Sequence, residues 1–407
     1  MLLVNIKGLV QVRELTSGPL CGESMAHLPV IENAYLKIEN GLITDYGPMD
    51  ILTHHDATTV DCRDRFVFPS YVDSHTHLIF AASREEEFEL KIKGATYQEI
   101  AAKGGGILNS ARKLQKSSED ELFERTLPRV REIIQSGTGV VEIKSGYGLT
   151  VEDELKMLRV ARRIGRETPL VVKTTFLGAH AIPSHHTKES YMKLIVNEMI
   201  PAVAHEKLAD FIDVFCETGF FSPEETEHIC DEGKKYGMKP RIHANQLGRS
   251  GGVQVGVKVN AMSVDHLEHM GEEEIDVLRG SLVMPTALPG AAFFLNLPFP
   301  PARKLIEGGL PLAIASDYNP GSAPSGDMNL MIALSCIKMK MTPAEAFNAA
   351  TINTASSLEL LQSHGSITRG KAGSVFITEK IPSIAYIPYR FGRNLVDRVI
   401  LNGKFVP

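Results

Sequence analysis

Eight short apolar runs in the middle of the chain constrain its fold more than any other feature of the sequence. Each run is rich in Val, Ile, Leu, Phe or Met, and amphipathic helical patterns such as Glu152–Arg166 and Pro343–Leu361 separate or follow them. Nearly continuous apolar runs are typical of strands that are covered on both faces, as in a parallel sheet. The runs are Phe66–Asp73, Gly139–Lys144, Leu170–Leu177, Phe211–Phe215, Pro240–His243, Ala261–Val264, Leu282–Thr286 and Leu312–Ala315.

Eight strand–helix units within about 290 residues match the usual size of a (β/α)8 barrel. The sequence therefore predicts an α/β fold of the TIM-barrel type. A doubly wound open sheet is the alternative, but no Gly-x-Gly-x-x-Gly turn follows the first central strand. The two ends of the chain differ from the middle, because residues 1–67 and the tail after Ile367 contain only short strand-like segments separated by Gly and Asp.

The composition excludes several classes of protein. Lys and Arg number 43 against 49 Asp and Glu, a net charge of −6, so we expect no nucleic-acid partner. We expect no membrane span either, because the uncharged stretch between Arg279 and Arg303 contains five prolines. The N-terminus does not have the pattern of a signal peptide. The odd number of cysteines, none in a Cys-x-x-Cys pair, favours a reducing cytoplasm: Cys21, Cys62, Cys216, Cys230 and Cys336.

Polar side chains with catalytic potential follow these runs at the point where each predicted strand ends. In a (β/α)8 barrel all such positions lie at the carboxyl-terminal mouth, where active sites are built. The residues are His75, His77, Tyr147, His180, His243, His266 and Asp317.

A metal site is predicted from the first of these positions. In a strand, residues two apart project to the same side, so His75 and His77 can reach one ion. His243 and Asp317 complete a set of three imidazoles and one carboxylate, which suits one Zn²⁺ or Fe²⁺/Fe³⁺ ion with a position left for water. The alternative is a group of hydrogen-bonded histidines in a polar barrel mouth.

The stretch from Phe68 to His77, with the sequence FPSYVDSHTH, resembles the opening signature of the amidohydrolase superfamily. That resemblance implies a metal-dependent barrel at residues 68–362 and a small β-sandwich made from residues 1–67 and 363–407. Many members bridge two metal ions with a carbamylated Lys on the fourth strand. The fourth run here, Phe211 to Thr218, contains no Lys, which favours the one-metal branch.

Within the superfamily, five stretches are similar to the imidazolonepropionase family. Its members open the ring of 4-imidazolone-5-propanoate to give N-formimidoyl-L-glutamate in histidine degradation. We therefore expect a small anionic substrate. We also expect a homodimer. By motif, the resemblance implies metal ligands at His75, His77, His243 and Asp317. It implies substrate or product contacts at Arg84, Tyr147, His180, Asn319, Gly321 and Ser322. The stretches begin at His77, Gly104, Lys144, Gly178 and Ser316.

The chemistry of that reaction fits these residue types. An Arg84 guanidinium can bind the propionate through two parallel hydrogen bonds, with Tyr97 assisting, although Arg84 could instead pair with acidic residues on the surface. Asp317 is expected to take up a proton from the attacking water. His180 and His266 are expected to polarise the ring carbonyl, although His266 could instead only orient Asp317.

One position departs from the related one-metal deaminases, which carry His-x-x-Glu after the fifth strand. Here the residue is Gln246, which donates and accepts hydrogen bonds but cannot titrate, so we expect a substrate contact there. Two alternatives to a cyclic amide hydrolase stay open. A deaminase of a cyclic amidine would release ammonia and is disfavoured by Gln246, and a small-molecule sensor would show no turnover with metal restored.

Overall fold

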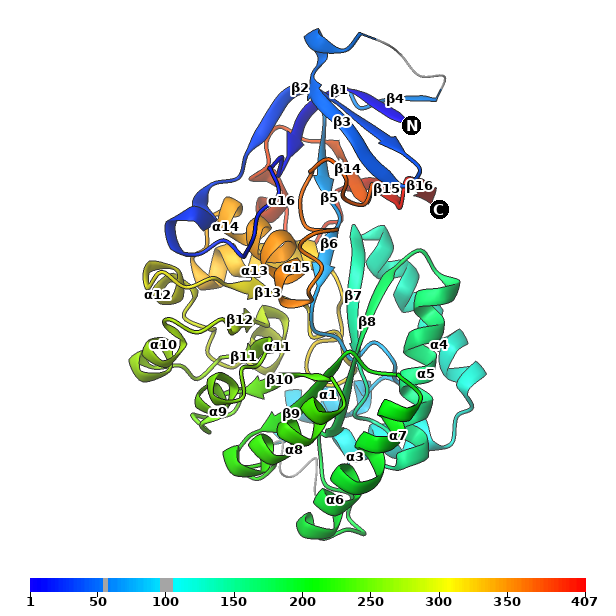
Figure 1. The fold of residues 1–407 in the computed structure, drawn as a ribbon, viewed down its shortest axis with the longest axis vertical. Helices are drawn as coiled ribbons and strands as arrows, with labels where there is room; N and C mark the ends of the chain where they lie inside the picture. Colours follow the sequence, from blue (N-terminus) through cyan, green and yellow to red (C-terminus); the bar gives the residue numbers. More distant parts are fainter. Residues whose placement is uncertain (54–57, 96–104) are drawn as a thin grey trace.

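A barrel of parallel strands forms the centre of the computed structural model, which describes residues 1–53, 58–95 and 105–407 (Figure 1). Its eight strands are hydrogen-bonded side by side in chain order, from β6 to β13. Thr76, just after β6, bridges Tyr318, just after β13, so the ring is nearly closed and the predicted barrel is confirmed. The strands are β6 (Tyr71–Asp73), β7 (Thr138–Lys144), β8 (Val171–Ala179), β9 (Phe211–Cys216), β10 (Lys239–Ala244), β11 (Ser263–His266), β12 (Met284–Ala287) and β13 (Ala313–Ile314).

Helices connect the barrel strands and cover the outside of the ring (Figure 1). Four of those described before β13 begin after a Ser or Thr whose hydroxyl accepts the backbone N–H three residues on, at Ser118, Thr150, Thr187 and Ser222. The described helices between β6 and β13 are α1 (Glu85–Ile92), α3 (Ile107–Gln115), α4 (Glu119–Gln135), α5 (Val151–Glu167), α6 (Lys188–Leu194), η3 (Ile195–Met199), α7 (Ile200–His205), α8 (Pro223–Lys235), α9 (Gly252–Lys258), α10 (Glu272–Leu278), α11 (Pro289–Leu295) and α12 (Ala302–Glu307).

After β13, the chain forms α13 (Met328–Met339) and then a helical segment that the sequence predicts as one helix over Pro343–Leu361. That prediction is wrong in detail, because α14 (Pro343–Asn348) passes into a five-residue π-helix, η4 (Ala349–Asn353), and then α15 (Thr354–Ser357). Buried amides lie on both sides of this π-helix. Asn348 Nδ2 donates to the carbonyl of Met25 at 2.7 Å, and Asn353 Nδ2 donates to that of Leu20 at 3.0 Å. The widened turn therefore fastens an N-terminal loop to the barrel.

The two ends of the chain together form a second sheet, in the part of the molecule where both termini lie (Figure 1). The strand order is β16-β15-β14-β5-β1-β2-β3, with β4 paired to β1. Leu3, Leu36, Val67 and Ile377 belong to a separate apolar core that these strands share. The strands are β1 (Leu2–Val10), β2 (Val30–Glu39), β3 (Leu42–Pro48), β4 (Thr59–Asp61), β5 (Arg65–Pro69), β14 (Val375–Lys380), β15 (Val396–Leu401) and β16 (Lys404–Val406).

The first apolar run, Phe66–Asp73, is divided between the two sheets rather than forming one strand. Ser70 marks the division, since its N–H donates to the carbonyl of Ser374 at 2.9 Å, on the side of the second sheet. The next N–H, of Tyr71, donates to the carbonyl of Gly137 at 2.9 Å, beside the barrel. The same apolar segment therefore leads directly from the second sheet to the first barrel strand and its two histidines.

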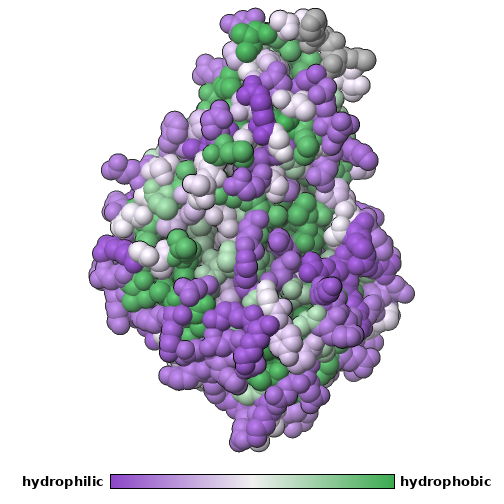
Figure 2. Space-filling model, viewed as in Figure 1, coloured by the Kyte–Doolittle hydropathy of each residue, from purple (hydrophilic) through white to green (hydrophobic). Residues whose placement is uncertain are grey.

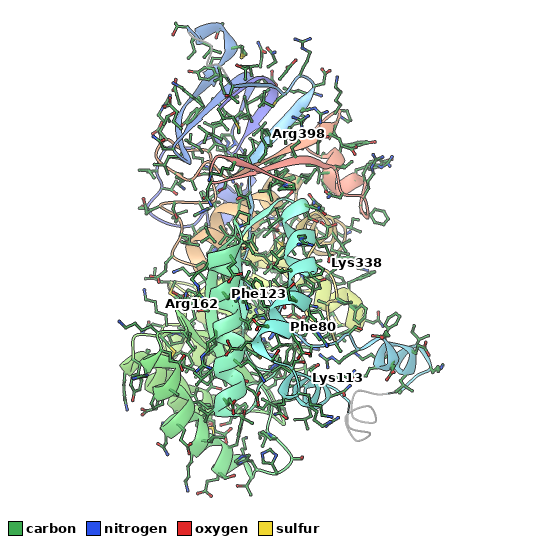
Figure 3. All side chains as sticks on the ribbon, turned by 90° about the vertical axis from the view of Figure 1, so that its right-hand side faces the viewer. Phe80, Lys113, Phe123, Arg162, Lys338 and Arg398 are labelled. Atoms are coloured by element: carbon green, nitrogen blue, oxygen red, sulfur yellow. The ribbon has the colours of Figure 1, made fainter. Side chains whose placement is uncertain are left out.

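Hydrophilic side chains cover most of the face that Figure 2 shows, with smaller apolar areas between them. Charged side chains such as Lys113, Lys338 and Arg398 are exposed, whereas Phe80 and Phe123 are buried (Figure 3). Among the described helices, none is long and apolar enough to cross a membrane.

A buried lysine in the segment before β14 leads to a first prediction. Lys371 is 1% exposed, and its Nζ donates to the carbonyl of His364 at 3.0 Å and to Ser366 Oγ at 2.8 Å, with no carboxylate in ion-pair range within the described residues. Burial lowers the pKa of Lys371 from 10.5 to about 8. Between pH 8 and 10.5 the unfolded chain therefore holds the proton that the folded protein has lost, and stability increases with pH over this window.

We therefore expect the wild-type protein to gain about 2–3 kcal/mol of unfolding free energy relative to Lys371→Met between pH 8 and pH 10.5. Urea denaturation of both proteins at the two pH values measures this difference. A constant difference between the two proteins would contradict the assignment.

Candidate active site

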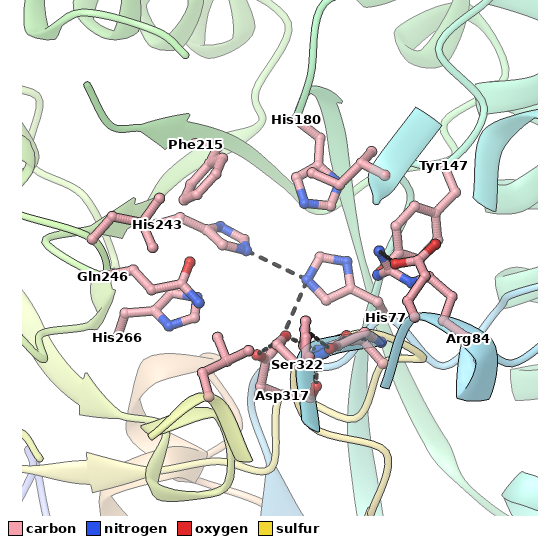
Figure 4. Close-up of a pocket in the computed structure, with 17 residues that line it drawn as sticks. His77, Arg84, Tyr147, His180, Phe215, His243, Gln246, His266, Asp317 and Ser322 are labelled. Carbon is pink, nitrogen blue, oxygen red and sulfur yellow. Dashed lines mark hydrogen bonds and ion pairs between the residues drawn. The ribbon is translucent and has the colours of Figure 1, made fainter. Parts of the chain in front are cut away.

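The carboxyl ends of the barrel strands surround a pocket of about 720 Å³ (Figure 4). Arg84 and Tyr147 lie on one side of it, Gln246 and His266 on the other, and Asp317 lies below His77 in this view. The pocket is lined by His77, Arg84, Glu87, Lys91, Ile107, Tyr147, His180, Phe215, His243, Gln246, Leu247, His266, Leu295, Asp317, Asn319, Gly321 and Ser322.

The four sequence-predicted metal ligands converge at the floor of this pocket. His75 and His77 follow β6, His243 lies in β10, and Asp317 follows β13. His243 Nε2 lies 3.1 Å from His75 Nε2 and 3.4 Å from His77 Nε2. Asp317 Oδ1 lies 3.6 Å from the Nε2 atoms of both His75 and His77. The Nε2 atoms of three imidazoles therefore lie close together, Asp317 Oδ1 borders two of them, and His266 also lies near His75 and Asp317.

The spacing and protonation of these donors fit a metal ion. Ligand atoms at 2.0–2.1 Å from a tetrahedral Zn²⁺ lie about 3.3–3.4 Å apart, close to the separations of 3.1 to 3.6 Å found here. Burial lowers the pKa values of His75, His77 and His243, so all three rings are neutral. Neutral imidazole is the form that binds a metal.

Two buried carboxylates hold ligand rings from behind. Asp265 Oδ2 lies 2.7 Å from His75 Nδ1, and Asp213 Oδ2 lies 3.0 Å from His243 Nδ1. At His75 this hydrogen bond keeps the ring proton on Nδ1 and turns the Nε2 lone pair toward the centre of the cluster, and Asp213 Oδ1 also accepts the backbone N–H of His243 at 3.1 Å. The residues present could therefore bind a metal ion at this point.

Buried cations balance those two carboxylates. Arg241 Nη2 lies 3.3 Å from Asp265 Oδ2, and Lys144 Nζ lies 2.9 Å from both Asp213 Oδ2 and Glu142 Oε1. All five side chains are fully buried. Sequence reasoning missed them, although there was a signal: each is a charged residue within or beside an apolar run, where a charge is retained only if it is paired.

His266 and Asp317 lie after or at the ends of strands with positive φ values of +88° and +57°. His266 Nδ1 lies 3.3 Å from Glu268 Oε1, a buried carboxylate that the sequence analysis did not single out. Burial alone would lower the pKa of His266, but the charge of Glu268 outweighs it and the pKa rises to about 9. Burial raises the pKa of Asp317 to about 7. His266 is therefore a cationic hydrogen-bond donor at neutral pH.

His180 has the opposite character. Its Nδ1 lies 3.0 Å from the carbonyl oxygen of Gly146, which can only accept, so Nδ1 carries the proton. Burial lowers the pKa of His180 to about 3, and the ring is neutral. Its Nε2 is then an acceptor, which favours a contact to a substrate N–H over the polarisation of a carbonyl. The ring stacks on that of His77, with centroids 5.1 Å apart.

The loop after β13 is held by its own asparagine. Asn319 Oδ1 accepts the N–H groups of Gly321 and Ser322, both at 2.8 Å. Asn319 Nδ2 donates to Ser322 Oγ at 2.7 Å, and this hydroxyl lies 3.3 Å from Asp317 Oδ2. Asn319 lines the pocket, but its side chain is occupied in positioning the two residues that follow it.

The guanidinium of Arg84 crosses over Gly321. A Cβ atom at position 321 would lie 2.0 Å from Arg84 Nη2, so only glycine leaves room for this arrangement. The Arg84 side chain is 8% exposed, and its Nε has no hydrogen-bond partner among the described residues. Glu87 and Lys91, which the sequence analysis did not assign, line the same side of the pocket. Tyr97, the predicted assistant of Arg84, lies outside the described residues.

The fold is similar to those of solved amidohydrolases. A 5-methylcytosine deaminase from Klebsiella pneumoniae superimposes with a TM-score of 0.76 at 15% identity, covering 100% of this chain and 98% of that one. An adenosine deaminase from Xanthomonas campestris, solved with bound zinc, gives a TM-score of 0.73 at 16% identity, covering 99% and 92% of the two chains. The model of the Amidohydrolase family matches residues 66–406. The chain therefore belongs to the amidohydrolase family.

Curated relatives narrow this assignment. The imidazolonepropionase of Flavobacterium johnsoniae is 52% identical over 100% of this chain and 99% of its own length. That of Geobacillus kaustophilus is 40% identical over 98% and 96%. Within the amidohydrolases, the chain belongs to the imidazolonepropionases.

Proposed function

We propose that this chain hydrolyses the ring C–N amide bond of 4-imidazolone-5-propanoate to give N-formimidoyl-L-glutamate, a step of histidine degradation. The observation that carries this proposal is one pocket that joins a cluster of three neutral imidazoles and a carboxylate to a nearly buried guanidinium. The cluster of imidazoles and carboxylate can promote the attack of water on an amide, and the guanidinium can bind a carboxylate. The relatives described above support the same reaction.

We assign the metal ligands to His75, His77, His243 and Asp317, and the ion to Zn²⁺ or Fe²⁺/Fe³⁺. When bound, such an ion supplies Lewis acidity and a hydroxide source at neutral pH. The chain itself accepts the proton of the attacking water at Asp317, a buried carboxylate that lines the pocket. His75 and His243 keep their orientation through the carboxylates behind them.

The remaining residues bind and orient the ring. His266, protonated beside Glu268, donates to the carbonyl oxygen as negative charge develops there. His180 accepts a ring N–H through its unprotonated Nε2. Gln246 offers its amide to the ring on the side of His266. Arg84, which lies across the pocket from Gln246, binds the propionate (Figure 4).

Metal removal gives the direct test of this function. We expect purified protein loaded with Zn²⁺ or Fe²⁺ to remove the absorbance of imidazolonepropionate, and chelator-treated protein to lose at least about 99% of that rate. Restoring either ion restores the rate, and no ammonia is released. Ammonia release would indicate a deaminase instead, and absence of turnover with metal restored would indicate a binding protein.

We further propose that each chain consists of a barrel at residues 68–362 and a terminal unit at residues 1–67 and 363–407. Two such chains form a homodimer, and the protein is located in the cytoplasm. The five cysteines support a reducing compartment, since all are free thiols in the structure. Light scattering of the purified protein tests the oligomeric state.

A further inference from the structure

Three charged residues share the face of α1 that borders the pocket. Arg84 directly precedes the helix, and Glu87 and Lys91 lie three and seven positions further on, a spacing that places side chains on one side of a helix. All three line the pocket. Two cations and one carboxylate leave one unbalanced positive charge on this face, at the end of the pocket to which we assign the propionate.

Glu87 is already engaged elsewhere. Its Oε1 accepts the N–H of Gly106 at 3.1 Å and Asn109 Nδ2 at 3.0 Å, at the start of α3. Its other oxygen lies 3.7 Å from Arg84 Nη1, longer than a hydrogen bond. The carboxylate therefore tethers α3 to α1 and gives Arg84 only a loose ion pair.

Lys91 lies close to Arg84 and has N–H donors that form no hydrogen bond within the described residues. Its Nζ donates to the carbonyl of Gly321 at 3.2 Å, the residue that the Arg84 guanidinium crosses. Within the described part of the chain this is its one hydrogen bond, whereas an ammonium has three N–H donors. The pKa of Lys91 is lowered by burial and by the charge of Arg84, which together outweigh the opposing effect of Glu87.

We propose that Lys91 is a second cationic contact for the carboxylate of the substrate, beside Arg84 at Gly321. This inference rests on the proposed function and adds a basis for selecting the charged substrate. Arg84 and Lys91 together select ring substrates that carry one negative charge, and Glu87 keeps the surplus on this face at a single positive charge.

The test compares the propionate substrate with its uncharged propionamide analogue in wild type, Lys91→Met and Lys91→Arg. A charge-assisted hydrogen bond corresponds to about a tenfold to hundredfold change in affinity. We therefore expect Lys91→Met to raise KM for the propionate at least about tenfold, with kcat within about threefold of wild type. Its kcat/KM for the propionamide stays near that of wild type, so discrimination between the two substrates falls by the same factor. Lys91→Arg keeps the charge and retains the discrimination.

Lys93→Met is the matched control, because Lys93 lies two positions further on, is 71% exposed and pairs with Glu89 at 3.4 Å. This variant should have the kcat and KM of wild type for both the propionate and the propionamide. A Lys91→Met variant that loses both substrates equally would show that Lys91 only supports the loop, and an unchanged KM would also overturn the proposal. A wild-type protein that does not hydrolyse the propionate at all would overturn the proposed function and this inference with it.

Discussion

Asp317→Asn is expected to lower kcat at least about 10³-fold while the fold is kept, since positioned acid–base groups contribute about 10²–10⁴-fold and this one is also assigned as a ligand. Asparagine has the shape of aspartate but neither accepts a proton at neutral pH nor brings a negative charge to a metal ion. The left-handed backbone at this position, with φ of +57°, suits Asn as well as Asp.

Single-turnover and steady-state rates, together with metal content by mass spectrometry, measure this effect. Asp276→Asn is the matched control, because Asp276 is exposed and, among the described residues, forms an ion pair only with Arg279, three positions further along the chain. It should change kcat by less than about twofold. An Asp317→Asn variant that retains a tenth or more of wild-type kcat would remove Asp317 from its assigned role.

Gly321→Ala is expected to raise KM for the propionate substrate about 10–100-fold with a smaller effect on kcat. The new methyl group would overlap Arg84 Nη2 and Cζ, at 2.0 and 2.2 Å. Because these atoms end a flexible side chain, the guanidinium moves away and the fold is retained. Arg84→Met removes the same contact directly, so it should give a similar increase in KM.

The double variant Gly321→Ala/Arg84→Met separates this explanation from a general effect on the loop. If alanine acts by displacing Arg84, the double variant has the KM of Arg84→Met, and the two effects are not additive. Gly18→Ala is the control glycine, because nothing lies within 4 Å of a Cβ at that position. Additive effects in the double variant would contradict the displacement of Arg84.

The barrel could be predicted because each of its strands is an apolar run, and buried parallel strands have little other sequence pattern. The division at Ser70 could not, since the residues on both sides of it are apolar and only the partners of their N–H groups tell the two sheets apart. The π-helix at Ala349–Asn353 depends in the same way on distant partners of buried amides. Local pattern specifies the elements, and tertiary hydrogen bonds specify where they are interrupted.

The candidate site shows a similar limit. His75 and His77 could be paired from the alternation of a strand, and the mouth of the barrel brought His243 and Asp317 to them. Asp213 and Asp265 could not be assigned to particular rings without the register between neighbouring strands. Glu87 and Lys91 share a face with Arg84 only because α1 begins at Glu85, a boundary that the run of acidic residues does not reveal.

The closure of the barrel has a consequence for how the enzyme is made. The N–H of Asp317 donates to the carbonyl of His75 at 2.9 Å, so the last strand is joined to the first at two of the proposed metal ligands. These two residues are 242 positions apart, and a ribosome working at about 5–20 residues per second needs roughly 12–50 s to pass from one to the other. Throughout that time the nascent chain has its first histidines but lacks the carboxylate that completes the set. With the proposed ligand set, the complete metal site therefore forms only late in biogenesis, on a nearly finished polypeptide.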